Sequence, residues 1–495
     1  MDKIPIYLIG VGGSGAKCVE AALHLHALGV FNDAAQTTEL KVLLVDADAA
    51  NGNLQRTGTT FQKLLRCWRG FTRGNSDFMA GEFVDYGTWN PLSHGNSSNN
   101  LAAIYNKTLM DSAEPALAQL FDALYTPEEQ GADLGVGFRG RPAIGSAVMS
   151  QVGEDDFRSG PWEQILNDLS ADVSSGNRPT IHICGSVFGG TGASGVPTLG
   201  TLLARRLGDM GLRQSVRVNS SLLLPYFEFD RPDDKDIYAE TRNFTLNTDA
   251  ALQYLKRMGQ NTFDTVYLVG STSKSRYEAS TGGARQENGA HFAELYAALA
   301  LRHSVQQSAQ QTQAAYISRT TSTGLDWNDL PEPEVTKPRL RKGIRFLHAW
   351  YYNFALELED ARAVGAKTFI KGGPWLEQFF ALSPRDTERP QVSAEEQKQL
   401  CEALDQWAQT CLSWLQQICA SAGQTDQLFK LERLGKVGDQ RPCRDTLGDI
   451  TLEGERPREE VAQDCCDRIK NQLTDAPPPP DPGVKGLVHS LYTKL

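Results

Sequence analysis

Two glycine-rich segments each follow a short, mostly apolar run, and this arrangement constrains the fold more than any other feature of the sequence. The run IPIYLIG leads into GVGGSG at residues 10–15, and TIHICGSV leads into FGGTGASGVP at residues 188–197. Short apolar runs that end in glycine are typical of buried strands. Glycine lets the backbone approach a phosphate and present N–H groups at the start of a helix. The pattern therefore predicts two phosphate-binding loops at strand ends.

Strand and helix patterns alternate through the first three hundred residues. ELKVLLVDAD, SVRVNSSLLLPYF and FDTVYLVG read as further strands, and NGAHFAELYAALALRHSVQQ reads as a long helix. This alternation predicts an α/β fold, a doubly wound parallel sheet with helices on both faces. The polar, glycine-rich stretch at about 54–133 reads as an insertion or as long loops. With 495 residues, the chain is expected to form two or three domains.

Composition excludes several classes of function. The net charge of −11 makes nucleic acid an unexpected partner, because affinity for nucleic acid rests largely on Lys and Arg. Nine scattered cysteines indicate reduced thiols and a cytoplasmic protein. The first residues do not resemble a signal peptide, and no apolar run reaches about 18 residues, so no membrane span is expected.

Two acids end the second predicted strand. Asp46 and Asp48, in VDADAANGN, fall on the same side of the strand end. Acids at this position hold a ribose or, through water, a magnesium ion, although Asp48 could instead cap the following helix. A glycine loop followed by D-x-D and by NLQR at residues 53–56 resembles both the adenylating, ThiF-like fold of ubiquitin-activating-type enzymes and the tubulin/FtsZ superfamily.

The second glycine loop favours the tubulin/FtsZ superfamily. GGTGASGVP resembles the FtsZ loop GGGTGTGAAP, with Phe188 in place of the first glycine. Three more segments resemble FtsZ loops in chain order: GVGFRGRPAIGSA at 135–147, LLLPYFEF at 222–229, and GLDWNDLP at 324–331. We therefore identify the chain as similar to a divergent bacterial tubulin-like protein. The resemblance does not extend to the last 160 or so residues.

The resemblance implies a site for GTP or GDP with Mg²⁺. Asp48 is the metal candidate. Asn288 either reads the base or only caps the core helix, and Lys17 either lies near the base or ribose or is solvated. The implied nucleotide-binding residues are Gly10, Gly12, Gly13, Ser14, Lys17, Asp46, Gly137, Arg139, Gly140, Arg141, Gly189, Gly190, Thr191, Gly192, Ala193, Glu228 and Asn288.

The resemblance also implies a mechanism that needs a second subunit. Asp326 and Asp329, in a loop after the core helix, would polarise water on the nucleotide of the next subunit in a head-to-tail filament; the alternative is a plain acidic turn. A non-polymerising nucleotide switch or scaffold, one use of which is defence, and an adenylating enzyme remain alternatives.

The same resemblance divides the chain into four parts. A nucleotide-binding domain is expected at 1–287, a core helix and synergy loop at 288–331, and a helical or α+β C-terminal domain at 332–475. Residues 476–495 form a proline spacer and a tail, which either binds a protein partner or docks on its own domain.

Overall fold

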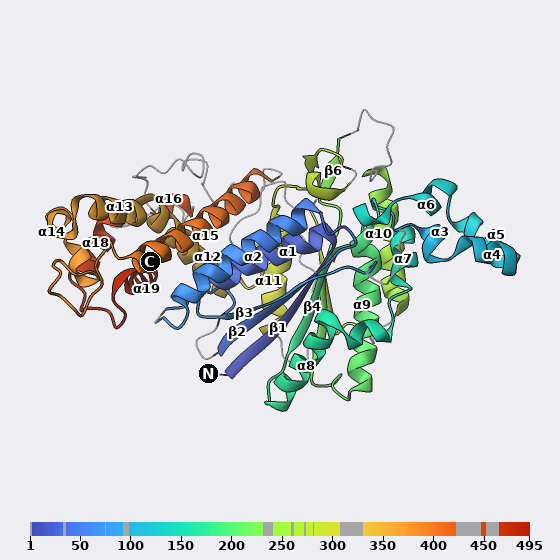
Figure 1. Cartoon of the computed structure of the whole chain (residues 1–495), viewed down its shortest axis with the longest axis horizontal. Helices are drawn as coiled ribbons and strands as arrows, with labels where there is room; N and C mark the ends of the chain where they lie inside the picture. Colours follow the sequence, from blue (N-terminus) through green and yellow to red (C-terminus); the bar gives the residue numbers. More distant parts are fainter. Residues whose placement is uncertain are drawn as a thin grey trace.

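The centre of the molecule is a six-stranded parallel sheet in the order β3-β2-β1-β4-β5-β7 (Figure 1). The structure is a computed structural model that describes residues 2–32, 36–74, 76–92, 99–230, 241–258, 262–271, 274–280, 282–306, 330–421, 447–451 and 465–495. The predicted α/β class with a parallel sheet is confirmed. The strands are β1 (Asp2–Val11), β2 (Gln36–Val45), β3 (Glu82–Trp89), β4 (Thr180–Ser186), β5 (Arg217–Leu223) and β7 (Thr265–Val269).

Helices cover both faces of the sheet because its central strands, such as β1 and β4, are buried on both sides. Ile6 and Leu8 of β1 belong to the core that α1, α2 and α11 share. Tyr7 and Ile9, which point the opposite way, belong to the core beneath α8 and α9. These helices are α1 (Gly12–Ala27), α2 (Gly52–Phe71), α8 (Gly160–Ser174), α9 (Gly190–Asp209) and α11 (Phe292–Gln306).

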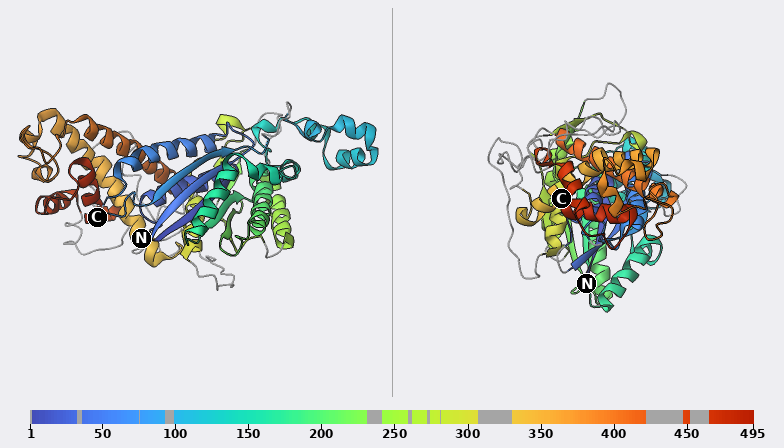
Figure 2. Two further views of the ribbon diagram at one scale, coloured as in Figure 1. Left: turned by 60° about the horizontal axis from the view of Figure 1, so that its bottom comes forward. Right: turned by 90° about the vertical axis from the view of Figure 1, so that its left-hand side faces the viewer.

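The expectation of an insertion or long loops at about 54–133 is wrong for the first half of that range, which belongs to the sheet domain. Helix α2 and strand β3 lie there. The apolar residues of α2 recur at helical spacing, at Leu54, Phe61, Leu64 and Phe71, but glycines and threonines between them hide the pattern. Only the later part projects as a separate lobe (Figures 1 and 2). The lobe consists of α3 (Leu101–Ile104), α4 (Lys107–Ala113), α5 (Pro115–Leu124) and α6 (Pro127–Gly131).

Shorter elements surround the carboxyl ends of the strands. A two-stranded parallel sheet pairs β6 with β8. The elements are η1 (Leu134–Val136), α7 (Pro142–Met149), η2 (Glu154–Arg158), β6 (Phe227–Phe229), α10 (Thr241–Met258), β8 (Ser275–Tyr277) and η3 (Gly283–Arg285).

Every regular element in the described residues of the C-terminal part is a helix, and the core of this part is continuous with the α1–α2–α11 face of the sheet. Helix α12 passes through a π-helical turn, η5, directly into α13. The elements are α12 (Pro333–Ala349), η5 (Trp350–Phe354), α13 (Ala355–Val364), α14 (Ala366–Phe369), η6 (Pro374–Gln378), α15 (Glu395–Ala420), α16 (Leu447–Ile450), α18 (Cys466–Thr474) and α19 (Gly483–Lys494).

The C-terminal tail docks on its own chain. It forms α19, in which the Tyr492 hydroxyl donates to the carbonyl oxygen of Leu28 at 2.6 Å. His489 Nε2 lies 2.8 Å from the carbonyl oxygen of Phe71. Both side chains are buried, so the tail is part of the core and not an extended peptide. Among the described helices, none has the length and apolar composition that crossing a membrane requires.

Candidate functional site

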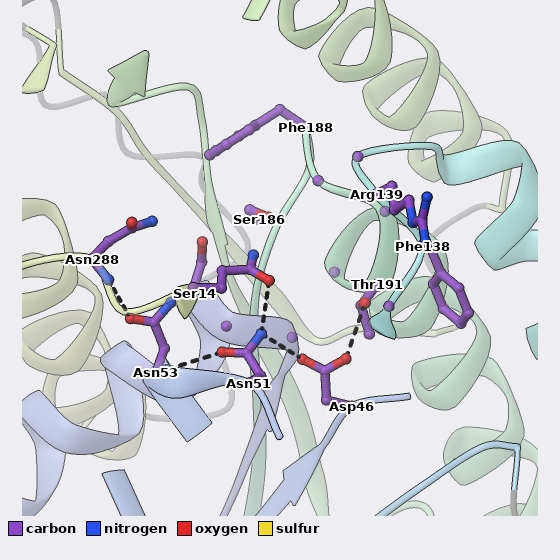
Figure 3. A pocket seen from close by; sticks show the side chains of 18 of the residues that line it. Ser14, Asp46, Asn51, Asn53, Phe138, Arg139, Ser186, Phe188, Thr191 and Asn288 are labelled. Atoms are coloured by element: carbon purple, nitrogen blue, oxygen red, sulfur yellow. Dashed lines mark hydrogen bonds between the residues drawn. The ribbon is translucent and has the colours of Figure 1, made fainter. Parts of the chain in front are cut away.

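A pocket lies at the carboxyl ends of β1, β2 and β4, where loops from distant parts of the sequence meet (Figure 3). This is where the strand order changes direction, because β1 is followed by β2 on one side and by β4 on the other. Most of the predicted nucleotide-binding residues line it: Gly12, Gly13, Ser14, Lys17, Asp46, Gly137, Arg139, Gly140, Gly189, Gly190, Thr191, Gly192 and Asn288.

Other predicted residues do not line the pocket. Gly10 lies in β1, where an added Cβ would meet the carbonyl oxygen of Gly15 at 2.8 Å, so it serves helix–strand packing. Arg141 forms an ion pair with Glu129 of the lobe. Glu228 pairs with Lys274 near the surface. Ala193 is buried in the first turn of α9. Asp326 and Asp329 lie outside the described residues.

Several lining residues were missed by the sequence reasoning. Asn51 is the N-cap of α2, and its side-chain oxygen accepts from the backbone N–H of Asn53 and Leu54. The asparagines just before an apolar-faced helix were the available signal. The missed residues are Asn51, Asn53, Val136, Phe138, Ser186, Phe188, Phe227, Phe229, Phe244, Ser280 and Gln286.

The first glycine loop approaches the second closely. Gly12 has a φ of +74°, a conformation that favours glycine, and an added Cβ there would lie 3.2 Å from Thr191 Cβ. At Gly13 an added Cβ would meet only the side-chain ends of Asn53 and Asn51, at 3.1 and 3.3 Å. The backbone at Gly12 and Gly13 is therefore open to a ligand in the pocket.

A third loop, residues 137–141, contributes a cation. Gly137, Arg139 and Gly140 all have positive φ values, of 85°, 46° and 69°. Positive φ is uncommon for arginine. Arg139 Nε is buried and has no hydrogen-bond partner within the described structure. Arg139 also lines the pocket, and a guanidinium there is a donor suited to an anionic group.

Asn247 of α10 ties two of the three loops together. Its side-chain amide donates to the carbonyl oxygens of Gly140 and Phe188, each at 3.0 Å. Phe188 directly precedes the glycines of the second loop. One carboxamide thus holds these two neighbouring loops of the pocket together, although Asn247 itself does not line it.

Asp46 lies between the first two loops. Its carboxylate accepts from the Thr191 hydroxyl at 3.4 Å and from Asn51 Nδ2 at 3.3 Å. Burial raises the pKa of Asp46 to about 7. A cation beside this carboxylate would favour its ionised form.

Asp48 is less suited to a metal than the sequence predicted. One carboxylate oxygen accepts from the Gly283 backbone N–H at 2.6 Å, and the other accepts from Ala50 N at 3.0 Å. It therefore fixes the loop that holds η3, and it does not line the pocket. No cluster of three potential His, Cys, Asp or Glu ligands occurs within the described ranges. Asp46 and the Thr191 hydroxyl are the oxygen ligands in the pocket that fit a magnesium ion carrying most of its waters.

Lys17 is buried, not solvated. Its Nζ lies 2.5 Å from Glu294 Oε1, and both side chains are at most 1% exposed. Glu294 Oε1 also accepts from the Tyr226 hydroxyl at 2.6 Å. Burial lowers the pKa of Lys17, and the Glu294 carboxylate opposes that shift. This ion pair joins α1, which starts at the first glycine loop, to the first turn of α11.

Uncharged hydrogen-bonding groups form the end of the pocket away from Arg139 (Figure 3). The backbone N–H of Asn288 donates to Asn53 Oδ1 at 2.9 Å, and Arg56 donates to the Asn288 carbonyl oxygen at 2.7 Å. The side-chain amide of Asn288 has no such partner among the residues that the structure describes, and it lines the pocket. The start of α11 is therefore held against α2 through its backbone, which leaves this side chain for a ligand.

Phenylalanines form an apolar wall of the same pocket. Phe244 of α10 packs against Phe188 with ring centroids 4.8 Å apart, and Phe227 packs against Phe188 at 5.2 Å. Phe229 extends this cluster. Aromatic rings on a wall suit a flat, apolar group of a ligand.

Comparisons with known proteins do not assign the chain to a family. No protein-family model matches the chain, and no curated protein matches it significantly. The fold and the pocket together define an α/β protein with a glycine-lined pocket at the carboxyl edge of a parallel sheet.

Proposed function

We propose that the chain is a nucleotide-binding protein of the tubulin/FtsZ type, which binds GTP or GDP with Mg²⁺ and assembles head to tail. The observation that carries the proposal is the convergence of three glycine-containing loops, at residues 10–15, 137–141 and 188–192, on one pocket. A pocket for an ordinary dinucleotide needs one such loop. Three loops suit a ligand whose phosphates are held from several sides.

The chemical polarity of the pocket supports a nucleotide in a defined direction. Arg139 and the backbone N–H groups of the glycine loops are donors suited to phosphates. The carboxamide of Asn288 and the phenylalanine wall are suited to a base and ribose. The pocket also lies where the strand order reverses, which is where open α/β sheets bind ligands.

Arg56 argues against the adenylating alternative. This residue ends the NLQR element that resembles those enzymes. Its guanidinium donates to both carboxylate oxygens of Glu20 and to the carbonyl oxygen of Asn288. It therefore holds α1, α2 and the start of α11 together and does not line the pocket.

In the proposed mechanism the subunit that binds the nucleotide supplies position and charge. Arg139 and the loop N–H groups hold the phosphates, and Mg²⁺ near Asp46 would neutralise part of their charge. Asp46 is the sole carboxylate among the described lining residues. Hydrolysis is therefore assigned to Asp326 and Asp329 of the next subunit, which would orient the attacking water.

The binding proposal is tested by calorimetry with GTP, ATP and guanosine in the presence of Mg²⁺. We expect Arg139→Ala to weaken GTP binding by at least tenfold, or about 1.4 kcal/mol, and to leave guanosine binding unchanged. Arg158→Ala is the matched control, because Arg158 pairs with Asp155 at the surface. Failure of the wild-type protein to bind any nucleotide would refute the proposal, and equal affinity for ATP would refute its guanine specificity.

The catalytic proposal is tested by turnover measured over a hundredfold range of protein concentration. Activity per subunit should rise with concentration, and Asp329→Ala should abolish it without weakening GTP binding. A mixture of Asp329→Ala and Arg139→Ala subunits should recover part of the activity, because one supplies a pocket and the other supplies the acids. A mixture that stays inactive, with turnover independent of concentration, would contradict catalysis between subunits.

A further inference from the structure

The projecting lobe exposes an apolar helix face that the proposed nucleotide site does not use. Leu117, Leu120 and Leu124 of α5 are 45%, 54% and 61% exposed. Ala116 and Ala123 on the same side are also exposed. We call these five residues the leucine face.

The leucine face is separate from the face by which α5 packs. Ala118 and Phe121 point inward and are buried in the small core of the lobe. The ring of Phe121 lies against those of Tyr105 and Tyr125, at centroid distances of 5.5 and 5.1 Å. Helix α5 is thus apolar on two sides, and only one of them is covered. A surface helix of a protein that works alone normally has a polar outer side.

The spacing of the leucine face is that of a helix-packing seam. Ala116, Leu117, Leu120, Ala123 and Leu124 follow the i, i+1, i+4, i+7, i+8 pattern by which one helix packs along another. The two alanines leave room for close approach of a partner backbone. Figure 1 and the left-hand view of Figure 2 place the lobe at one end of the molecule, clear of the sheet and of the C-terminal helices.

The charge of the lobe selects the kind of partner. Residues 101–131 contain five acidic residues and one lysine, a net charge of −4. The single lysine, Lys107, is already paired with Asp111 and Asp122. Two lobes facing each other would repel, and so would a lobe and an anionic membrane. A helix that carries Lys or Arg beside its apolar side would instead be attracted by the net negative charge of the lobe.

We propose that the leucine face is a docking site for an amphipathic helix of another protein, with an apolar seam and Lys or Arg on both flanks. The lobe that carries the site is linked to the loop that carries Arg139, because Glu129 of α6 pairs with Arg141. The docking itself does not depend on the proposed function. It rests on the exposure, spacing and charge of the lobe.

The test uses a synthetic three-heptad helix with leucine at the a and d positions and lysine at e and g, which like-charge repulsion keeps monomeric. Fluorescence anisotropy should detect its binding to the full chain, and a peptide with glutamate at e and g should bind at least tenfold more weakly. Changing Leu117, Leu120 and Leu124 together to serine should weaken binding of the lysine peptide by at least tenfold. These side chains are exposed, so an unchanged Tm would show that the fold is intact.

The control changes other exposed apolar residues, Leu246, Leu268 and Val364, to serine and should leave the affinity unchanged. Equal binding by the wild type and the α5 variant would overturn the proposal. Sedimentation of the wild type as a dimer that the α5 variant abolishes would assign the face to a second copy instead. Flotation with zwitterionic vesicles that requires the three leucines would assign it to a membrane, and either result would also overturn the proposal.

Discussion

The two glycine loops at strand ends look alike in sequence but use their glycines differently. In the first loop the roles are divided. An added Cβ at Gly15 would lie 2.5 Å from the Cys184 carbonyl oxygen, whereas at Gly13 it would meet only flexible side-chain ends. In the second loop an added Cβ at Gly190 would lie 2.7 Å from Phe138 Cβ, and one at Gly192 would lie 2.5 Å from the Ser186 carbonyl oxygen.

Because of this difference, a substitution in the first loop can test ligand binding alone, whereas one in the second loop also tests folding. In the first loop, Gly15 serves packing whereas Gly13 lines the pocket, so the site can be altered at Gly13 without altering the fold. In the second loop the same glycines line the pocket and allow the chain to pack. A valine at Gly190 or Gly192 is therefore a test of folding before it is a test of binding.

The largest expected effect is that of Gly192→Val. The added side chain would collide with the backbone of Ser186 at the end of β4, which cannot move without disturbing the sheet. We expect Tm to fall by roughly 10 °C or more, or soluble protein to be lost. Gly208→Val, in the same helix with nothing within 4 Å of the added Cβ, should change Tm little. A stable Gly192→Val protein with weak nucleotide binding would show that the two loops do not differ in this way.

The next effect is the pH dependence caused by Asp46, which joins the two loops. Its pKa is raised to about 7 from the ordinary 3.8, so the folded protein keeps a proton that the unfolded chain loses. Stability therefore falls as pH rises between these values, and the whole loss is present above pH 7. Relative to the wild type, Asp46→Asn should gain about 3 kcal/mol of unfolding free energy between pH 5 and pH 8. Urea unfolding at both pH values measures it.

A matched control for Asp46 is Asp155→Asn, because Asp155 is exposed and pairs with Arg158 at the surface. The free energy of unfolding of Asp155→Asn should differ from that of the wild type by the same amount at pH 5 and at pH 8. If the unfolding free energy of Asp46→Asn also differed from that of the wild type by the same amount at both pH values, Asp46 would have an ordinary pKa in the folded state.

A smaller effect is expected from Asn247→Asp, which tests whether the second loop depends on its neighbour. The substitution keeps the size of the side chain but removes the amide that donates to Gly140 and Phe188. We expect GTP to bind about tenfold more weakly and guanosine to bind as before, because only the phosphate loops would separate. Gln253→Glu, on the exposed side of α10, is the charge control. Equal losses for GTP and guanosine would mean that Asn247 supports the whole pocket.

The smallest effect is that of Gly13→Ala. The new methyl group would displace the ends of Asn51 and Asn53 by a few tenths of an ångström, so we expect an unchanged Tm and about threefold weaker GTP binding. Gly15→Ala is the matched substitution in the same loop, and it should lower Tm because its neighbour is the backbone of β4. A lower Tm for Gly13→Ala, or an unchanged one for Gly15→Ala, would remove the distinction between the two kinds of glycine.

The sequence by itself determined the parallel sheet and the positions of its glycine loops. Apolar runs such as IPIYLIG and the glycines after them are local signals, since burial and backbone freedom act within a few residues. Local signals also led to a wrong prediction for α2 and β3. The alternation in β3 is weak, and glycines and threonines interrupt the apolar side of α2, so both elements were predicted to be an insertion.

Only the tertiary structure decided which of the predicted residues share a site. Arg139 and Arg141 are two residues apart, yet the first lines the pocket and the second pairs with Glu129 of the lobe. Asp48 is engaged by the backbone of Gly283, far away in the sequence. Burial and hydrogen-bond partners are properties of contacts between distant segments, and no spacing along the chain encodes them. For the same physical reason, the sequence did not predict the phenylalanine wall or the Lys17–Glu294 pair, which join residues far apart in the chain.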